Sequence, residues 1–285
     1  MTATSNETPK VGFLTSMLRR AKQGQAVAPV LGSAKRFPHG AFQFQVRVAS
    51  GSSYELQASS DMKNWKSIHT DTAAGETVEY LDTDAFNFSF RFYRGISGGL
   101  ASKSILGYAS VTLPPGFSMI ANPFNAASNR VGALFPELAD GTTLSKFDTS
   151  LFRLTNNSVK GGQWTNPNEA FVPGEGAIIF NPTTDFKTIN FVGDVSQGRL
   201  TNPIPAGMSI RSSLVPQPGR LNPDLDFPIA EGDVVHMFDR DQQKYIIHPY
   251  SAKGWEREAP VVGVGESFWI GKKHPGNWVR NLAVS

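Results

Sequence analysis

The chain contains two copies of one sequence module, and equivalent residues of the copies are 91 positions apart. What repeats is a set of apolar residues, glycines and turn residues, so the duplicated feature is a fold. The matching stretches are 113–119 (LPPGFSM) with 204–210 (IPAGMSI), 141–148 (GTTLSKFD) with 232–239 (GDVVHMFD), and 173–176 (PGEG) with 264–267 (VGES). We expect both copies to share one topology, with Trp164 and Trp255, and Phe147 and Phe238, at equivalent core positions.

The composition favours an all-β protein. The 285 residues include 27 glycines and 19 prolines, only 18% are charged, and long helical patterns are nearly absent. The chain has no cysteine, which excludes disulfides and thiolate metal sites. We predict four parts: a basic arm (1–37), a small β-sandwich (38–105), copy A (106–195) and copy B (196–285).

The N-terminal arm concentrates positive charge. Residues 1–37 have a net charge of +5, so the remainder has −2. A short helix with one apolar face is expected near its start, and the extended segment 26–31 contains Pro29, which confines it to an edge strand or a strand entry. We predict that the arm docks on a neighbouring subunit and that it does not bind nucleic acid. The residues expected to make the docking contact are Val11, Leu14, Leu18, Arg19, Arg20, Val27, Val30 and Leu31.

Residues 38–105 predict half-buried strands. Phe42, Phe44, Val46 and Val48 alternate with polar residues. The pattern from Tyr54 to Trp65 (YELQASSDMKNW), closed by RFYR at 91–94, resembles the fibronectin-III-like modules of secreted bacterial proteins. The segment is short for a seven-stranded sandwich, so either one strand is missing or the arm supplies it.

The duplicated module also resembles a known type of repeat. The stretch GFSMIANP (116–123), the tryptophan, and PGEG (173–176) resemble a tandem β-repeat of secreted and cell-surface bacterial proteins. That repeat marks a structural module without one shared activity. The resemblance implies an extracellular or cell-surface location, although residues 1–10 lack the pattern of a secretory signal and no 18-residue apolar run predicts a membrane span.

No catalytic, cofactor or metal site is predicted. Glu175 and Glu266 occupy equivalent turns, and each lacks the second carboxylate that glycosidase chemistry requires. We interpret them as carboxylates that accept backbone N–H groups. The histidines show no ligand spacing, and the acidic pairs 224/226 and 239/241 do not continue into calcium loops. Nucleophile-elbow and phosphate-loop patterns are missing as well.

Aromatic residues distinguish the two copies. Copy B has Tyr245, Tyr250, Trp269 and Trp278 where copy A has Leu154, Val159, Ile178 and Lys187. Three interpretations stay open: different core packing, a protein interface, or a platform for sugar rings.

The leading hypothesis is a non-enzymatic structural subunit that self-associates, as a homo-oligomer or homopolymer, into a surface or extracellular filament or coat. The alternative is a carbohydrate-binding or adhesive module that uses the copy B aromatics on a polysaccharide. The two hypotheses differ in whether those aromatics form one exposed platform.

Overall fold

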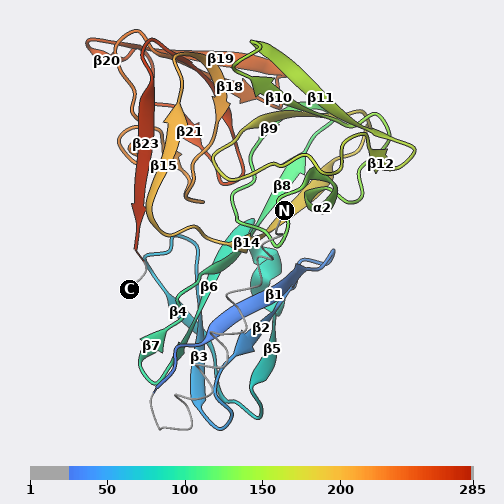
Figure 1. Ribbon diagram of the computed structural model, residues 1–285, viewed down its shortest axis with the longest axis vertical. Helices are drawn as coiled ribbons and strands as arrows, with labels where there is room; N and C mark the ends of the chain where they lie inside the picture. The colour runs from blue at the N-terminus through green and yellow to red at the C-terminus, as the bar shows by residue number, and fades with distance from the viewer. Residues whose placement is uncertain (1–25, 284–285) are drawn as a thin grey trace, which may run out of the picture. The chain divides into compact units, whose positions relative to one another are not determined.

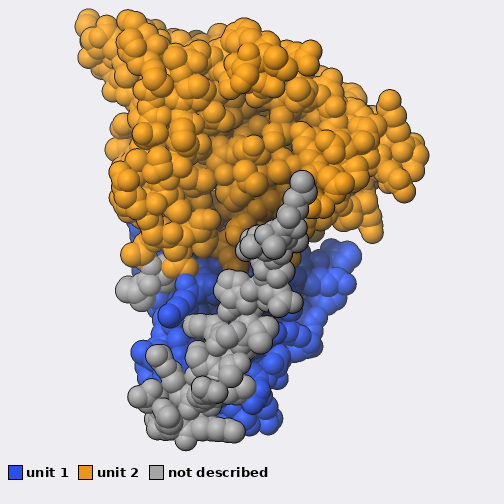
Figure 2. All heavy atoms as spheres, viewed as in Figure 1, with its two compact units in different colours: residues 1–106, 285 blue, residues 107–284 orange. Residues whose placement is uncertain are grey.

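A computed structural model describes residues 26–283, and almost all of its regular structure is antiparallel strand, which confirms the all-β prediction. The chain divides into two compact units (Figure 2). Unit 1 ends at Leu106, and unit 2 runs over Gly107–Val284 and therefore holds both copies of the repeat. Among the described residues, no helix is long and apolar enough to cross a membrane.

Unit 1 contains two small antiparallel sheets, ordered β1-β2-β5 and β4-β3-β6, with β7 paired to β6. Its elements are β1 (Val30–Arg36), β2 (Phe42–Arg47), β3 (Ser53–Ser59), β4 (Lys66–Thr72), β5 (Thr77–Asp82), the 3-10 helix η1 (Thr83–Asn87), β6 (Phe90–Ser97) and β7 (Leu100–Ala101). The predicted alternation is confirmed in β2, where Phe42, Phe44 and Val46 are fully buried. These inward-facing side chains form the core because successive residues of a strand point to opposite faces.

β1 is an edge strand that begins directly after Pro29. It pairs with β2 from Val30 to Arg36, with an irregular register between Gly32 and Lys35. A proline is tolerated here because an edge has one side without ladder bonds. The segment 30–36 therefore supplies a strand to the sandwich, although it falls within the range predicted as the arm.

In unit 2 the two copies use the same strand order. The five-stranded sheet of copy A is ordered β12-β11-β10-β13-β9, and that of copy B is ordered β20-β19-β18-β22-β16. The elements are β8 (Leu106–Leu113), β9 (Gly116–Ile120), α2 (Val131–Leu134), β10 (Thr143–Asp148), β11 (Arg153–Lys160), β12 (Gln163–Trp164), β13 (Ala177–Asn181), β14 (Lys187–Asp194), β15 (Gly198–Ile204), β16 (Gly207–Arg211), β17 (Gly219–Arg220), β18 (Val234–Asp239), β19 (Lys244–Ser251), β20 (Gly254–Trp255), β21 (Val261–Val262), β22 (Phe268–Lys272) and β23 (Gly276–Leu282).

Strand registers repeat at the spacing read from the sequence. Leu144 lies opposite Ile179 in copy A, and Val235 lies opposite Ile270 in copy B, 91 residues further along. β14 pairs with β8, and β23 pairs with β15 in the same way. The expectation of one shared topology is confirmed.

The two copies meet along a reciprocal contact, which we call the seam. The N–H of Ala121 donates to the carbonyl of Gly265 (2.8 Å), and the N–H of Ser212 donates to the carbonyl of Gly174 (3.2 Å). Ser212 is 91 residues after Ala121, and Gly265 is 91 residues after Gly174. Each copy therefore supplies the donor of one bond and the acceptor of the other. A contact in which the same patch of two modules pairs with itself has two-fold character.

Glycine is required in both turns of the seam. Gly174 has φ +90° and Gly265 has φ +82°, a region that L side chains rarely adopt. A Cβ at Gly265 would lie 2.6 Å from Cγ2 of Val111, and one at Gly174 would lie 2.8 Å from Cδ2 of Leu214. The repeated glycines that reveal the duplication in the sequence therefore also permit close approach of the copies.

Candidate functional site

Glu175 and Glu266 hold their own turns, as predicted. Oε2 of Glu175 accepts the N–H of Val172 (3.0 Å), and Oε2 of Glu266 accepts the N–H of Gly263 (2.9 Å). The basic partners differ, because Lys146 pairs with Glu175 and Arg240 pairs with Glu266. The shared role is the turn, whereas the cation comes from a different position in each copy.

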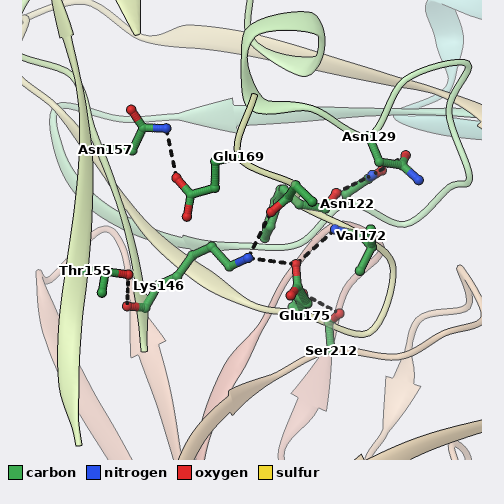
Figure 3. A network of polar contacts seen from close by, with 11 residues as sticks. Asn122, Asn129, Lys146, Thr155, Asn157, Glu169, Val172, Glu175 and Ser212 are labelled. Carbon is green, nitrogen blue, oxygen red and sulfur yellow. Dashed lines mark hydrogen bonds and ion pairs between the residues drawn. The ribbon is translucent and has the colours of Figure 1, made fainter. Parts of the chain in front are cut away.

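A polar network surrounds Glu175 in copy A (Figure 3). Nζ of Lys146 also donates to the carbonyl of Ala170 (2.9 Å), and the hydroxyl of Ser212 donates to the carbonyl of Glu175 (2.9 Å). Further along the same loop, Nδ2 of Asn157 donates to Glu169 (2.8 Å). These contacts fasten the loop to neighbouring strands and to copy B, so we interpret the network as structural.

Trp278 is a core residue, which excludes the interface and sugar interpretations for this side chain. The side chain is 1% exposed and its Nε1 donates to the carbonyl of Leu225 (2.7 Å). Its ring packs edge-on against Phe227, with ring centroids 4.9 Å apart. The burial follows from β23, where alternate residues face the core. Different core packing between the copies is therefore the correct interpretation here.

Tyr250 also lies apart from the other predicted aromatics. It is half-buried, and its ring packs edge-on against Trp255 at 5.1 Å, where β19 pairs with β20. Trp255 is only half-buried, whereas its counterpart Trp164 is 7% exposed, with its Nε1 donating to Phe135 (2.9 Å). The predicted core position is thus confirmed for Trp164 and holds only in part for Trp255.

Tyr245 and Trp269 come together in a row of aromatic residues that we call the aromatic strip. The indole Nε1 of Trp269 donates to the hydroxyl of Tyr245 (3.2 Å). Trp269 also packs against Phe147 of copy A, with ring centroids 4.9 Å apart. The complete strip is Phe152, Phe147, Trp269, Tyr245, Phe238 and His236. Ring centroids lie 4.9 to 6.5 Å apart in four pairs, namely Phe152–Phe147, Phe147–Trp269, Tyr245–Phe238 and Tyr245–His236.

The strip crosses from one copy to the other. Phe147 of β10 contacts Trp269 of β22, so the strip joins the sheets of the two copies, whose strands are labelled in Figure 1. In β18, His236 and Phe238 alternate with the buried Val235 and therefore lie on the face opposite the core. Phe152 is 68% exposed and Tyr245 is 42% exposed. The adjacent exposed apolar side chains are Leu151, Leu154 and Ile247. A contiguous exposed apolar patch marks a binding surface.

Four members of the strip were not predicted as surface residues. Phe147 and Phe238 were expected in the core, but both are half-buried members of the strip. Phe152 and His236 were not proposed as interface residues. The available signal was alternation, since His236 and Phe238 share one face of β18 with Tyr245 and Trp269 opposite them.

Partial burial affects the titrating groups of the strip. Burial lowers the pKa of His236 and raises the pKa of Tyr245, although the hydrogen bond from Trp269 opposes the second shift. Both shifts favour the neutral side chain, because burial disfavours charge. The strip therefore presents uncharged rings near neutral pH.

A hollow of about 410 Å³ adjoins the strip at Tyr245. We call it the edge hollow, since it follows the outer edge of β19. Its lining residues are Gln242, Lys244, Tyr245, Ile246, Ile247 and Arg257. The edge hollow is an open surface depression whose wall combines three apolar or aromatic side chains with three polar or charged ones.

The arm residues fall into two groups. Val11, Leu14, Leu18, Arg19 and Arg20 lie outside the described residues. Val27 and Val30 are half-buried, and Leu31 is 4% exposed, with its side chain close to Gly95 of the same unit. Leu31 is therefore part of the sandwich core and is not available to a neighbouring subunit, which corrects that part of the docking prediction.

Over residues 26–283 no group of three or more His, Cys, Asp or Glu side chains is placed to hold a metal ion. Asp224 instead pairs with Arg220 (2.8 Å), and Asp239 accepts the N–H groups of Asp241 and Gln242. Comparison with models of known protein families gives no match, and comparison with curated proteins gives none either.

Proposed function

We propose that the chain is a non-enzymatic structural subunit that self-associates into a surface or extracellular assembly. The observation that supports this most is the aromatic strip with its exposed apolar neighbours. Phe152, Leu151 and Leu154 are 68%, 58% and 44% exposed, and side chains of this kind gain about 25 cal/mol per Å² when a partner covers them. Exposed leucine and phenylalanine suit a protein partner.

The partner we propose is a second copy of this chain. Residues 1–37 carry a net charge of +5 and the remainder carries −2, so the basic end of one copy attracts the body of another. In this proposal, the part of the N-terminal arm that does not pack into the sandwich adds a contact to a neighbouring subunit. Burial of the strip contributes the apolar part of the interface.

The test is the particle mass of the purified full chain by size-exclusion chromatography with light scattering, over a concentration series. We expect a mass well above the 31.0 kDa of one chain. Phe152→Asn should lower it, because asparagine tolerates the positive φ of this position (49°) and removes the ring. Phe186→Asn, also at a side chain 68% exposed but outside the strip, should leave the mass unchanged. A strictly monomeric chain at high concentration would overturn the proposal.

Carbohydrate binding is the second candidate, and one observation favours it. The Tyr245–Trp269 hydrogen bond holds two rings side by side next to the edge hollow. Flat apolar ring faces pack against the C–H faces of sugars, while nearby polar groups bind hydroxyls. Turnover is not part of either candidate, and hydrolysis of a glycoside or ester panel that a point mutation in this chain abolishes would contradict both.

A further inference from the structure

The edge hollow lies along a part of β19 that has no strand beside it on that edge. β20 pairs with β19 only at Tyr250 and Ser251, so residues 244–249 lack a strand partner there within the described part of the chain. The side chain of Tyr245 flanks the hollow and is 42% exposed. A ligand at this edge therefore meets an aromatic side chain together with polar side chains.

Two cations line the hollow. No ion pair within residues 26–283 involves Lys244 or Arg257, so both positive charges are available to a ligand. The charge of Arg257 reaches β19, because it adds to the effect of burial in lowering the pKa of His248. Two unpaired positive charges beside an exposed aromatic ring favour a ligand that is both negatively charged and ring-shaped.

Copy A does not reproduce this arrangement. At the spacing of 91 residues, Tyr245 corresponds to Leu154 and Arg257 corresponds to Asn166, while Lys244 corresponds to Arg153. Gln242, the amide of the set, corresponds to Leu151. The shared topology therefore does not require Tyr245, Arg257 or Gln242. The equivalent positions of copy A can serve as controls for variants of copy B.

We propose that the edge hollow of copy B binds an acidic sugar unit, carboxylated or sulfated, of a polysaccharide. The proposal rests on the second candidate function and adds the charge class of the sugar. Lys244 and Arg257 bind the anionic group, Tyr245 packs against the sugar ring, and Gln242 binds hydroxyls.

The charge of unit 2 argues for a sugar and against nucleic acid. Residues 107–284 contain 15 Lys and Arg and 16 Asp and Glu, a net charge of 15 − 16 = −1. A protein that follows a phosphate backbone presents a broad basic surface. Two local cations on a slightly acidic body suit isolated carboxylates or sulfates better.

The experiment is affinity electrophoresis of the full chain in gels containing polygalacturonate, dextran sulfate, unmodified dextran or a single-stranded oligonucleotide. We expect retardation by one or both acidic polymers and none by dextran, weakened by added salt. Lys244→Gln combined with Arg257→Gln should reduce the affinity about tenfold or more, and Tyr245→Leu, which installs the copy A residue, should do the same. Arg153→Gln in copy A should leave binding unchanged.

The outcomes separate the proposal from the functions on which it builds. Binding of dextran as tight as that of dextran sulfate, lost in Tyr245→Leu, overturns the acidic assignment and keeps the sugar function. No retardation by any polysaccharide overturns both. Preferential retardation by the oligonucleotide, or an equal loss in Arg153→Gln, also overturns the proposal. Urea unfolding of each variant confirms that lost binding is not lost folding, and the particle mass tests self-association separately.

Discussion

The side chain of Gln243 pairs with the backbone of Phe117 as a strand would. Its Oε1 accepts the N–H of Phe117 (2.7 Å) and its Nε2 donates to the carbonyl of the same residue (2.9 Å). A hairpin of copy B thereby covers the open edge of β9 in copy A. An uncovered edge presents unpaired N–H and C=O groups, so this contact both joins the copies and protects the edge.

Gln243→Asn should weaken unit 2. Asparagine keeps the positive φ of this position (50°) but is one methylene too short to reach both backbone groups. Loss of two exposed hydrogen bonds should reduce the free energy of unfolding by about 1 kcal/mol. Urea titration measures this, with Phe152→Asn, at the equivalent position of copy A, as the control. An equal loss in the control would show that the backbone conformation, not the pairing, is responsible.

Truncation of the repeated tryptophans should cost unequal amounts. Trp164→Ala removes a buried ring and a hydrogen bond to Phe135, so we expect a loss of about 3–5 kcal/mol. Trp255→Ala should cost clearly less, because that ring is half-buried. Chemical denaturation of both variants checks the order. A loss below about 1 kcal/mol for Trp164→Ala would contradict its place in the core.

A buried ion pair in copy B should be costly to break on one side only. Lys272 pairs with Asp233, and their side chains are 4% and 0% exposed. The Lys272 ammonium also donates to Pro228 (2.6 Å), and the N–H groups of Ala230 and Lys273 donate to the carboxylate (2.8 Å each). Lys272→Met should therefore destabilise the fold by about 3–5 kcal/mol, because it leaves a buried carboxylate unpaired.

The double variant Asp233→Thr with Lys272→Asn installs the copy A residues Thr142 and Asn181. It leaves no buried charge, so it should lose less stability than Lys272→Met in the same urea titration. A double variant that is the less stable of the two would show that the site depends on the pair itself and not on charge balance.

Asp61 should make unit 1 sensitive to acid. Its carboxylate accepts the N–H groups of Asn64 (2.7 Å) and Lys63 (2.8 Å), and these bonds, that of Asn64 first, hold its pKa well below the usual value. The unfolded value is about 3.9. A folded pKa below the unfolded one gives stability that is present above about pH 4 and is lost as pH falls through the folded pKa.

Asp61→Asn should accordingly flatten the pH dependence of unfolding between about pH 4 and pH 2. Denaturation of the wild type and the variant at pH 6 and pH 2.5 measures it. If the free energy of unfolding falls by the same amount in both proteins between pH 6 and pH 2.5, the acid sensitivity belongs to other carboxylates.

Much of the fold is readable from the repeat, because turns and apolar alternation set strand order locally. The exchange of core aromatics between the copies is not readable in the same way. Copy B fills its core with Phe268 and Trp278, where copy A has Ala177 and Lys187. Which large ring fills which space depends on packing across sheets, so Trp278 looks like a surface residue when the copies are only aligned.

The binding surface is half predictable for a related reason. Tyr245 and Trp269 stand out because copy A lacks them, but Phe147 joins them only through the contact between copies. Sequence distance gives no indication of that meeting, since 122 residues separate Phe147 from Trp269. Periodicity predicts the face of a strand, whereas the partner of that face comes from tertiary structure.

The reciprocal hydrogen bonds of Ala121 and Ser212 have a consequence for any assembly. A two-fold contact is closed once both halves are satisfied, and here one polypeptide carries both halves. The seam thus resembles a dimer interface formed within one chain, and its donors and acceptors are already paired with each other. Recruitment of a partner therefore falls to surfaces away from the seam, such as the aromatic strip, which combines rings that both copies have with rings that only copy B has.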